Sequence, residues 1–193
     1  MSIEFYHDTE TDNRLLRRAT KWIVDLAVVF TLALFLVQYM GMQYAVSGHS
    51  MEPTLYGGDV VLVDRISYRL RRPKRLELVV FQKRDDEDRQ YLKRIIGLPG
   101  ETVQIKGGQI YIDGGLLKLP ESLSQVNLAG LAEEPVMLGE GEYFLLGDNR
   151  DSSEDSRFEN IGNVSIGQIT GKAWFRPSPL ERIGFLNSTD GRE

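Results

Sequence analysis

A candidate serine nucleophile, Ser50, lies within the stretch Ser47-Gly48-His49-Ser50-Met51-Glu52-Pro53-Thr54-Leu55. A serine becomes a nucleophile when a nearby base takes its proton. The histidines of the chain are His7 and His49. In an extended segment His49 and Ser50 point to opposite faces, and a long apolar run separates His7 from Ser50. The sequence therefore disfavours a serine–histidine–aspartate triad.

A lysine is the other base available to Ser50, and it works only when its amine is neutral near the working pH. Moving a lysine pKa from about 10.4 to about 8 takes about 3 kcal/mol, which a desolvating apolar wall can supply. Strand alternation places Lys93 on one face with Tyr91 and Ile95, which makes it the first candidate, and Lys172 is the second. Either could equally be a structural lysine that extends its amine to water, and the pattern alone favours that interpretation over both assignments.

The elements that must position these residues begin with the apolar run from Trp22 to Met40, whose one charged residue is Asp25. About 19 residues at about 1.5 Å each reach roughly 28 Å, which is one bilayer crossing. Basic residues precede the run and the next one after it is Arg65, so we expect residues 1–21 in the cytoplasm and the rest outside. The plasma membrane is the first expectation.

Two other interpretations of the apolar run stay open. A cleaved signal peptide would also place basic residues, an apolar region and Ala45-Val46-Ser47 in this order, although this apolar region exceeds the usual length of about 7–15 residues. A buried core helix is the other alternative, but such helices are seldom apolar all round over this length.

Composition describes a foldable chain with one principal domain, at 193 residues, 41% hydrophobic and 26% charged. A net charge of -5 argues against a protein that coats nucleic acid, so no nucleic acid is expected among its partners. Cysteine is absent, which excludes thiol catalysis, disulfides and cysteine-ligated zinc.

Beyond the apolar run, short β-type segments separated by glycine, proline and acidic clusters predict a mostly β domain. The Gly107-Gly108 turn predicts a hairpin over residues 102–115. Residues 83–89 are predicted to be a solvated hairpin loop, and residues 118–135 an irregular excursion or a short helix. The other strands are expected at residues 59–64, 76–81, 91–96, 143–146 and 169–175.

Four segments give the chain a resemblance to the type I signal peptidases, membrane-anchored serine–lysine endopeptidases that remove signal peptides from exported proteins. They are Ser50-Met51-Glu52-Pro53-Thr54-Leu55, Gly58–Asp64, Lys93–Glu101 and Gly147–Arg157. The chain resembles the branch with glycine two residues before the nucleophile. The resemblance implies a mostly β fold, an antiparallel β-sheet catalytic domain of signal peptidase type anchored by one N-terminal transmembrane helix. Its parts would be a cytoplasmic tail (1–21), the transmembrane helix (22–40) and the extracytoplasmic catalytic β domain (41–193).

The resemblance also implies roles for five residues of the site. Ser50 matches the nucleophile, Lys93 the general base, and Ser153 a hydroxyl that orients the lysine. Asp155 and Arg157 match a supporting ion pair, for which simple stiffening of the loop is an equal alternative.

Three further residues, Met51, Tyr91 and Leu92, are expected to line the pocket for the small residue before the cut, in substrates with Ala-x-Ala-like ends. Core packing is the equal alternative for Met51. The resemblance implies no cofactor and no metal. The expected partners are the signal peptides of exported preproteins and the lipid bilayer, and the oligomeric state stays open.

Two positions depart from the family pattern. Gly48 replaces a hydroxyl residue that helps some members to bind the oxyanion, so we expect backbone donors, the Ser50 N–H first among them. Arg75-Leu76-Glu77 stands where the family has Arg-Gly-Asp, which keeps the charge but leaves the turn geometry open.

Two alternative functions remain. One is a noncatalytic membrane-tethered β module that binds exported chains. The other is a self-cleaving repressor with the same serine–lysine chemistry, which would need a DNA-binding head where this chain has its apolar run.

Overall fold

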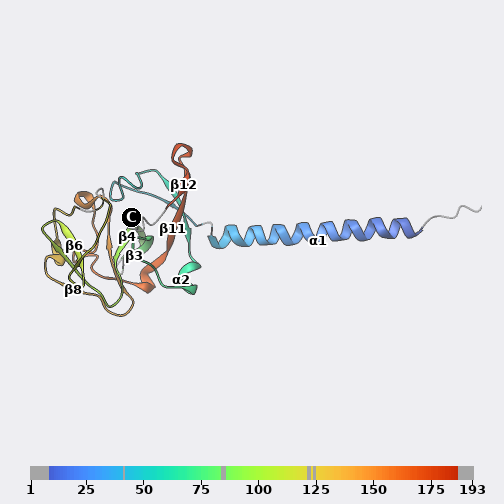
Figure 1. The fold of residues 1–193 in the computed structure, drawn as a ribbon. Helices are drawn as coiled ribbons and strands as arrows, with labels where there is room; N and C mark the ends of the chain where they lie inside the picture. Colours follow the sequence, from blue (N-terminus) through green and yellow to red (C-terminus); the bar gives the residue numbers. More distant parts are fainter. Residues whose placement is uncertain (1–8, 41, 84–85, 121–122, 124, 187–193) are drawn as a thin grey trace, which may run out of the picture. The chain divides into compact units, whose positions relative to one another are not determined.

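The computed structural model describes residues 9–40, 42–83, 86–120, 123 and 125–186, and the chain divides into two compact units, Met1–Tyr39 and Met40–Glu193. Helix α1 (Thr9–Met40), blue in Figure 1, accounts for the smaller unit. Across the described residues, no helix is at once long enough and apolar enough to cross a membrane. The predicted transmembrane helix therefore stays a prediction.

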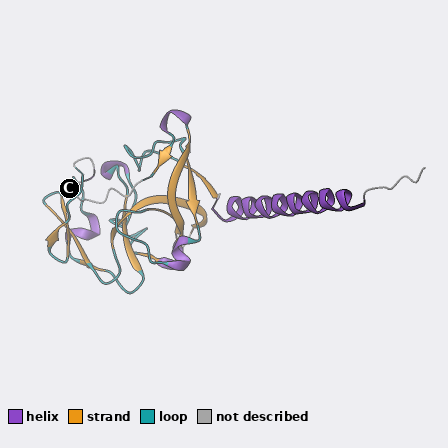
Figure 2. Cartoon of the chain, turned by 45° about the vertical axis from the view of Figure 1, so that its right-hand side comes forward, coloured by secondary structure: helices purple, strands orange, loops and turns teal. Residues whose placement is uncertain are grey.

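The larger unit is built mainly from antiparallel strands, which confirms the mostly β prediction (Figure 2). Its eight-stranded sheet has the order β1-β2-β11-β3-β4-β9-β10, and β12 pairs with β11. Strands far apart in the sequence thus become neighbours. The strands of this sheet are β1 (Met42–Ala45), β2 (Val60–Asp64), β3 (Leu78–Lys83), β4 (Asp86–Gly97), β9 (Glu142–Leu146), β10 (Val164–Ser165), β11 (Ile169–Ser178) and β12 (Gly184–Phe185).

A second, four-stranded sheet has the order β7-β6-β5-β8. The predicted hairpin is its centre, because β5 (Thr102–Lys106) pairs with β6 (Gln109–Ile112). The turn between them needs φ values of 55° at Gly107 and 78° at Gly108, which glycine adopts without a Cβ clash. The outer strands are β7 (Gly115–Leu116) and β8 (Val136–Met137).

Short helical turns lie in the connections between strands. Those with both ends among the described residues are α2 (Ser67–Leu70) and four 3₁₀ turns, η1 (Gly130–Glu133), η2 (Arg150–Ser152), η3 (Ile166–Gln168) and η4 (Leu180–Arg182). The turn η1 falls within the predicted excursion at 118–135, of which residues 121–122 and 124 lie outside the described residues.

One apolar cluster of the core connects the sheet with the segment that carries the candidate nucleophile. It contains Met51 and Leu55 from that segment, Leu92 from β4, and buried residues of β2, β3 and β11. Because both Met51 and Leu55 are fully buried, the backbone around Ser50 is held by packing on each side of the turn.

The prediction of a solvated loop over residues 83–89 is wrong in its extent. Strand β4 begins at Asp86, and Lys83 is paired with Asp86 across the hairpin. The charge run resembles a loop in sequence, but a ladder uses backbone hydrogen bonds and can carry charged side chains where a face meets water. Strand β3 likewise begins two residues later than predicted, since Leu76 has a φ of 66°, which no strand residue adopts.

Candidate active site

Ser50 lies in the connection between β1 and β2, and its backbone is bonded to a distant loop. The Ser50 carbonyl accepts a hydrogen bond from the Asn149 N–H at 3.1 Å. The Leu55 N–H donates to the Met51 carbonyl at 2.9 Å, which closes the turn that follows. The Ser50 side chain is partly exposed while its neighbour Met51 is buried, so the hydroxyl is held in place and open to a substrate.

Lys93 reaches Ser50 from strand β4. Lys93 is 3% exposed, and its Nζ lies 2.8 Å from Ser50 Oγ. Burial lowers the pKa of Lys93 to about 8, against the opposing effect of nearby carboxylates, of which Asp155 is the strongest. An amine with this pKa is partly neutral near neutral pH, and at this distance its lone pair can accept the serine proton.

Asp155 and Arg157, the expected ion pair, lie together with both side chains fully buried. Arg157 donates from Nε to Asp155 Oδ1 at 2.8 Å and from Nη2 to the Arg150 carbonyl at 2.7 Å. Its Nη1 donates to the Leu128 carbonyl at 3.0 Å. The pair therefore joins two turns of its own loop to the excursion after β7.

Ser153 is buried against Gly147, beside the turn that carries the candidate nucleophile Ser50 (residues 50–55, the nucleophile turn). A Cβ at Gly147 would lie 2.1 Å from Ser153 Oγ and 2.6 Å from the Ser50 carbonyl oxygen, so only glycine permits this approach. Within the described residues the Ser153 hydroxyl has no hydrogen-bond partner. Its orienting effect on Lys93 therefore stays a prediction.

Arg94 is a residue of the site that our sequence interpretation missed. Its buried guanidinium forms a bidentate pair with Asp148, at 2.7 Å from Nε and 2.6 Å from Nη2. It also donates to the Leu76 carbonyl at 2.9 Å and to Thr54 Oγ1 at 3.3 Å. The sequence carried a signal for it, because two adjacent cations in a strand, Lys93 and Arg94, must point to opposite faces.

Arg150 was missed as well, and it differs from Arg94 in its bonding. Its side chain is buried, and its three guanidinium nitrogens have no hydrogen-bond partner within the described part of the chain. Burial lowers the pKa of Arg150 to about 10, partly offset by Asp148 and Asp155. This charge lies in the loop beside the site, where it opposes the field of those two carboxylates.

A cleft of about 310 Å³ opens beside Ser50, and it brings together the three residues predicted for the substrate pocket. Met51 and Leu92 are buried in its wall, and Tyr91 is half-buried. Lys93 lines the same cleft. Ser50 and Lys93 thus share one cleft with the predicted pocket residues.

Tyr44 lines the cleft too and was not predicted. Its hydroxyl donates to the Gln90 carbonyl at 3.0 Å, which links β1 to β4 although the two strands are not paired. Burial raises the pKa of Tyr44, so the hydroxyl stays protonated and available as a donor. The signal in the sequence was weak, because a tyrosine in a short strand usually indicates core packing.

The alternative bases have other partners in the structure. His49 Nδ1 lies 2.8 Å from Glu52 Oε1, and the His49 side chain is 72% exposed. Lys172 Nζ donates to Glu77 Oε1 at 3.0 Å. Neither contact involves Ser50, so of the three candidate bases with described side chains only Lys93 is bonded to Ser50.

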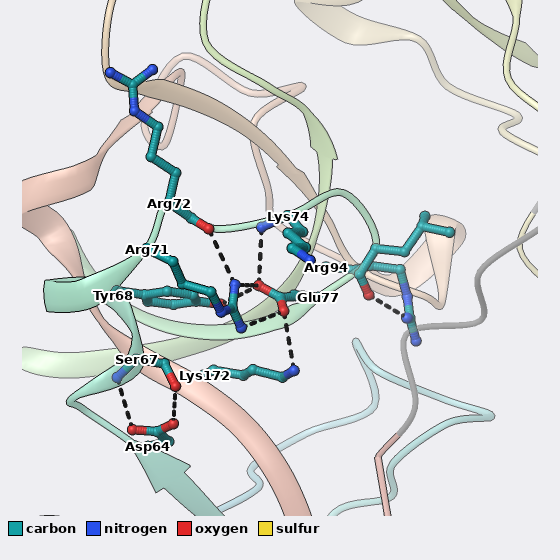
Figure 3. Close-up of polar contacts among 10 residues, drawn as sticks. Asp64, Ser67, Tyr68, Arg71, Arg72, Lys74, Glu77, Arg94 and Lys172 are labelled. Atoms are coloured by element: carbon teal, nitrogen blue, oxygen red, sulfur yellow. Dashed lines mark hydrogen bonds and ion pairs between the residues drawn. The ribbon is translucent and has the colours of Figure 1, made fainter.

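Glu77 is the centre of a buried polar network next to the site, shown in Figure 3. Its carboxylate accepts hydrogen bonds from Arg71, Lys172, Tyr68 and the Lys74 N–H. Burial alone would raise the pKa of Glu77, but the bonds from Arg71, Lys74 and Lys172 lower it to about 2. Arg75-Leu76-Glu77, which replaces the Arg-Gly-Asp of the family, therefore still supplies a carboxylate at residue 77. Leu76 adopts the left-handed region, with a φ of 66°.

The arrangement contains the parts of nucleophilic acyl transfer: a hydroxyl, a base of suitable pKa at hydrogen-bond distance, and a cleft for the acyl group. Over the described residues, no group of three or more His, Asp or Glu side chains is placed to hold a metal.

Comparison with known proteins identifies the family. The model of the family described as signal peptidase, peptidase S26, matches residues 19–177. A signal peptidase I of Bacillus caldolyticus is 36% identical over 179 residues, 87% of this chain and 94% of the relative. A probable signal peptidase I-2 of Synechocystis is 38% identical over 151 residues, 75% of this chain and 66% of the relative.

A solved signal peptidase I of Enterococcus faecalis V583 is 28% identical, and the match covers 53% of this chain and 97% of that one, with a TM-score of 0.43. The family match extends over most of the larger unit and includes Ser50, Lys93 and the loop to Arg157. The chain therefore belongs to the signal peptidase family, peptidase S26, and is a hydrolase of the signal peptidase I type.

Proposed function

We propose that the protein is a membrane-bound serine endopeptidase that removes N-terminal signal peptides from exported preproteins with a Ser50–Lys93 dyad. The observation that carries the proposal is the 2.8 Å distance between Ser50 Oγ and the buried Lys93 amine, whose pKa is about 8. The names of its relatives support the substrate class.

The reaction begins when the neutral Lys93 amine takes the Ser50 proton and Oγ attacks the scissile carbonyl. Lys93 then gives that proton to the leaving amine, and the C–N bond breaks to leave an ester on Ser50. Water, deprotonated by Lys93, attacks the ester and releases the signal peptide, and Ser50 regains its proton. The Ser50 N–H is the expected donor to the oxyanion, because Gly48 has no side chain to contribute.

Ser153, Asp155 and Arg157 support the dyad in this proposal. The buried Asp155–Arg157 pair holds the backbone of the loop, and Asp155 Oδ2 also accepts the Gly147 N–H at 3.0 Å. These bonds place Ser153 next to the nucleophile turn, where its hydroxyl can accept from or donate to the amine as its charge changes.

The substrate would lie extended in the cleft, with the small residue before the cut against Met51, Tyr91 and Leu92. Strand β1 is an edge strand of the main sheet, so the residues that follow it offer backbone groups to an added strand. The buried side chains of Met51 and Leu92 form part of the cleft wall, and small pockets against them would select alanine-sized residues, in keeping with the Ala-x-Ala-like ends that the resemblance implies.

The anchor of this proposal is the apolar segment of α1. Trp22, Leu26 and Phe30 are among its large side chains that are exposed along the helix, as expected for a surface facing lipid. The basic residues before Trp22 predict a cytoplasmic N-terminus, an extracytoplasmic larger unit and a single pass through what we expect to be the plasma membrane.

Cleavage of a preprotein in detergent tests the dyad. Ser50→Ala and Lys93→Ala should each lower the rate of cleavage by at least about 1,000-fold, because neither the nucleophile nor its base can be replaced by water. The matched controls are Ser47→Ala, an exposed serine lining the same cleft, and Lys118→Ala, an exposed lysine.

The controls should cleave at the rate of the unmodified protein. Cleavage that persists in both Ser50→Ala and Lys93→Ala would show that the assignment is wrong. If those variants also sustain export in cells, the protein acts as a noncatalytic module that binds exported chains.

A further inference from the structure

One surface segment of the larger unit is strongly basic although the protein is acidic. From Arg65 to Arg75 the sequence contains six Lys or Arg residues and no Asp or Glu, in a chain of net charge -5. A concentration of one sign of charge against the net charge of the molecule creates a local field that selects anionic partners.

Two of the six cations are used inside the molecule. Arg71 donates to both carboxylate oxygens of Glu77, at 3.1 and 2.7 Å. Arg75 pairs with Glu101 at 2.5 Å. Both are only partly exposed, so their charges are already compensated.

The other four cations form what we call the basic patch, and all four are exposed: Arg65, Arg69, Arg72 and Lys74. Within the described part of the chain, their side chains make no hydrogen bond and no ion pair. Figure 3 shows the contrast at two adjacent residues, because the Arg72 guanidinium points away from the network around Glu77 while Arg71 is bonded within it.

Hydrogen bonds to two buried carboxylates hold the backbone of this segment at both ends. Asp64 Oδ1 accepts the Ile66 and Ser67 N–H groups at 2.8 and 3.1 Å, before the first turn of α2. After α2, Glu77 Oε2 accepts a hydrogen bond from the Lys74 N–H at 2.9 Å. The patch therefore presents its charges from an ordered backbone, which lowers the entropy lost when a ligand is bound.

A groove of about 450 Å³ runs beside the patch, and Arg65 and Arg69 both line it. Two guanidinium groups in one groove can donate several hydrogen bonds to the oxygens of a phosphate group. Leu70 stands next to Arg69 and is 84% exposed. A phosphate site with a neighbouring exposed leucine combines the two features by which proteins bind the surface of a bilayer.

The position of the groove along the chain favours a lipid over a soluble phosphate compound. Met42 also lines it, and Met42 is two residues beyond Met40, the last residue of α1. The groove therefore includes a residue close in sequence to the segment proposed as the membrane anchor, which favours a lipid phosphate as the ligand.

We propose that the basic patch is a docking surface for anionic phospholipids, in which Arg65 and Arg69 bind one headgroup phosphate and Leu70 enters the interfacial layer. The proposal rests on the proposed membrane anchor. Docking holds the larger unit against the bilayer. The cleft then has fewer orientations available when it meets a membrane-bound substrate.

Hydrogen exchange of the full-length protein in lipid nanodiscs tests the docking. In discs with about 30% phosphatidylglycerol, amides of residues 65–75 should exchange about 10-fold more slowly than in pure phosphatidylcholine, and about 0.5 M salt should remove the difference. The variant Arg65→Gln/Arg69→Gln should lose this slowing. The matched control Lys106→Gln/Lys118→Gln removes the same charge from two exposed lysines elsewhere and should retain it.

A second measurement separates docking from folding and catalysis. The Arg65→Gln/Arg69→Gln variant should cleave a soluble peptide at an unchanged rate, while its KM for a membrane-inserted preprotein rises about threefold or more in anionic discs. If the dyad assignment is wrong, cleavage persists in Ser50→Ala and Lys93→Ala, while the exchange result for residues 65–75 is unaffected.

Four outcomes would overturn the docking surface. The exchange of residues 65–75 could be the same in neutral and anionic discs. The slowing could be reproduced in neutral discs by about 10 mM inorganic phosphate, which would identify a soluble anion as the ligand. It could also require added preprotein, which would identify a polypeptide partner. Loss of the protein from neutral discs would remove the anchor and, with it, this proposal.

Discussion

The pKa of Lys93 predicts how the rate of cleavage depends on pH. With a pKa of about 8, about one tenth of the protein holds a neutral amine at pH 7, compared with roughly 0.03% for a lysine at its ordinary pKa of 10.5. Burial thus increases the reactive fraction by about 300-fold, equivalent to about 3.4 kcal/mol. If Lys93 is the base, kcat/KM should rise about tenfold per pH unit below pH 8 and level off above it.

The assay is cleavage of a fluorogenic signal-sequence peptide from pH 5.5 to 10. Lys93→Arg should abolish the pH-dependent rate, because a guanidinium cannot become neutral in this range. Glu154→Gln removes a carboxylate that raises the pKa of Lys93, so the rising limb should move to lower pH by less than about one unit. A limb near pH 6.5, or one that stays in place when Lys93 is replaced, would refute this assignment of the base.

The same burial carries a cost in stability whose sign follows from linkage. Below pH 8 the folded state must hold a buried charged amine, and that penalty is relieved as the pH rises from about 8 to 10.5, because only the unfolded chain still binds the proton there. Lys93→Met should therefore raise the free energy of unfolding at pH 7 by about 1–3 kcal/mol, measured by chemical denaturation. A less stable variant would contradict the pKa assigned to Lys93.

Three other changes give separate tests. Gly147→Ala should lower kcat by at least about 100-fold with the fold retained by circular dichroism, since its Cβ would meet Ser153 Oγ at 2.1 Å, and a normal kcat would contradict the packing of this loop. Glu77→Gln should reduce the free energy of unfolding by about 2–3 kcal/mol at pH 7 but very little near pH 2, because the contribution of Glu77 is present above its ordinary pKa of 4.5 and is lost as pH falls toward about 2. Equal losses at both pH values would refute this account. Met51→Ala should enlarge the pocket and raise cleavage after leucine, relative to alanine, by about 10-fold in a peptide library, and unchanged selectivity would place Met51 in the core alone.

The strands were predictable where their pattern is local. The hairpin at 102–115 follows from β-branched residues around a Gly-Gly turn, and it is confirmed as β5 and β6. The loop predicted over 83–89 was too long, because Lys83 pairs with Asp86, which composition does not reveal, and residues 84–85 lie outside the described residues. The placement of β11 between β2 and β3 was also beyond local pattern, since it depends on pairing across about 90 residues of sequence to β3 and about 110 to β2.

For the site, the residue types and their order along the chain narrowed the candidates for the reaction. The absence of cysteine, the places of the two histidines and the family segments already favoured Ser50 and Lys93. The sequence could not determine that Lys93 Nζ lies 2.8 Å from Ser50 Oγ, nor that Arg94 joins Asp148 behind them. Those facts depend on which faces are buried and on what surrounds each charge, and a buried charge takes its pKa and its partners from groups far away along the chain. Only the tertiary structure brings those groups together.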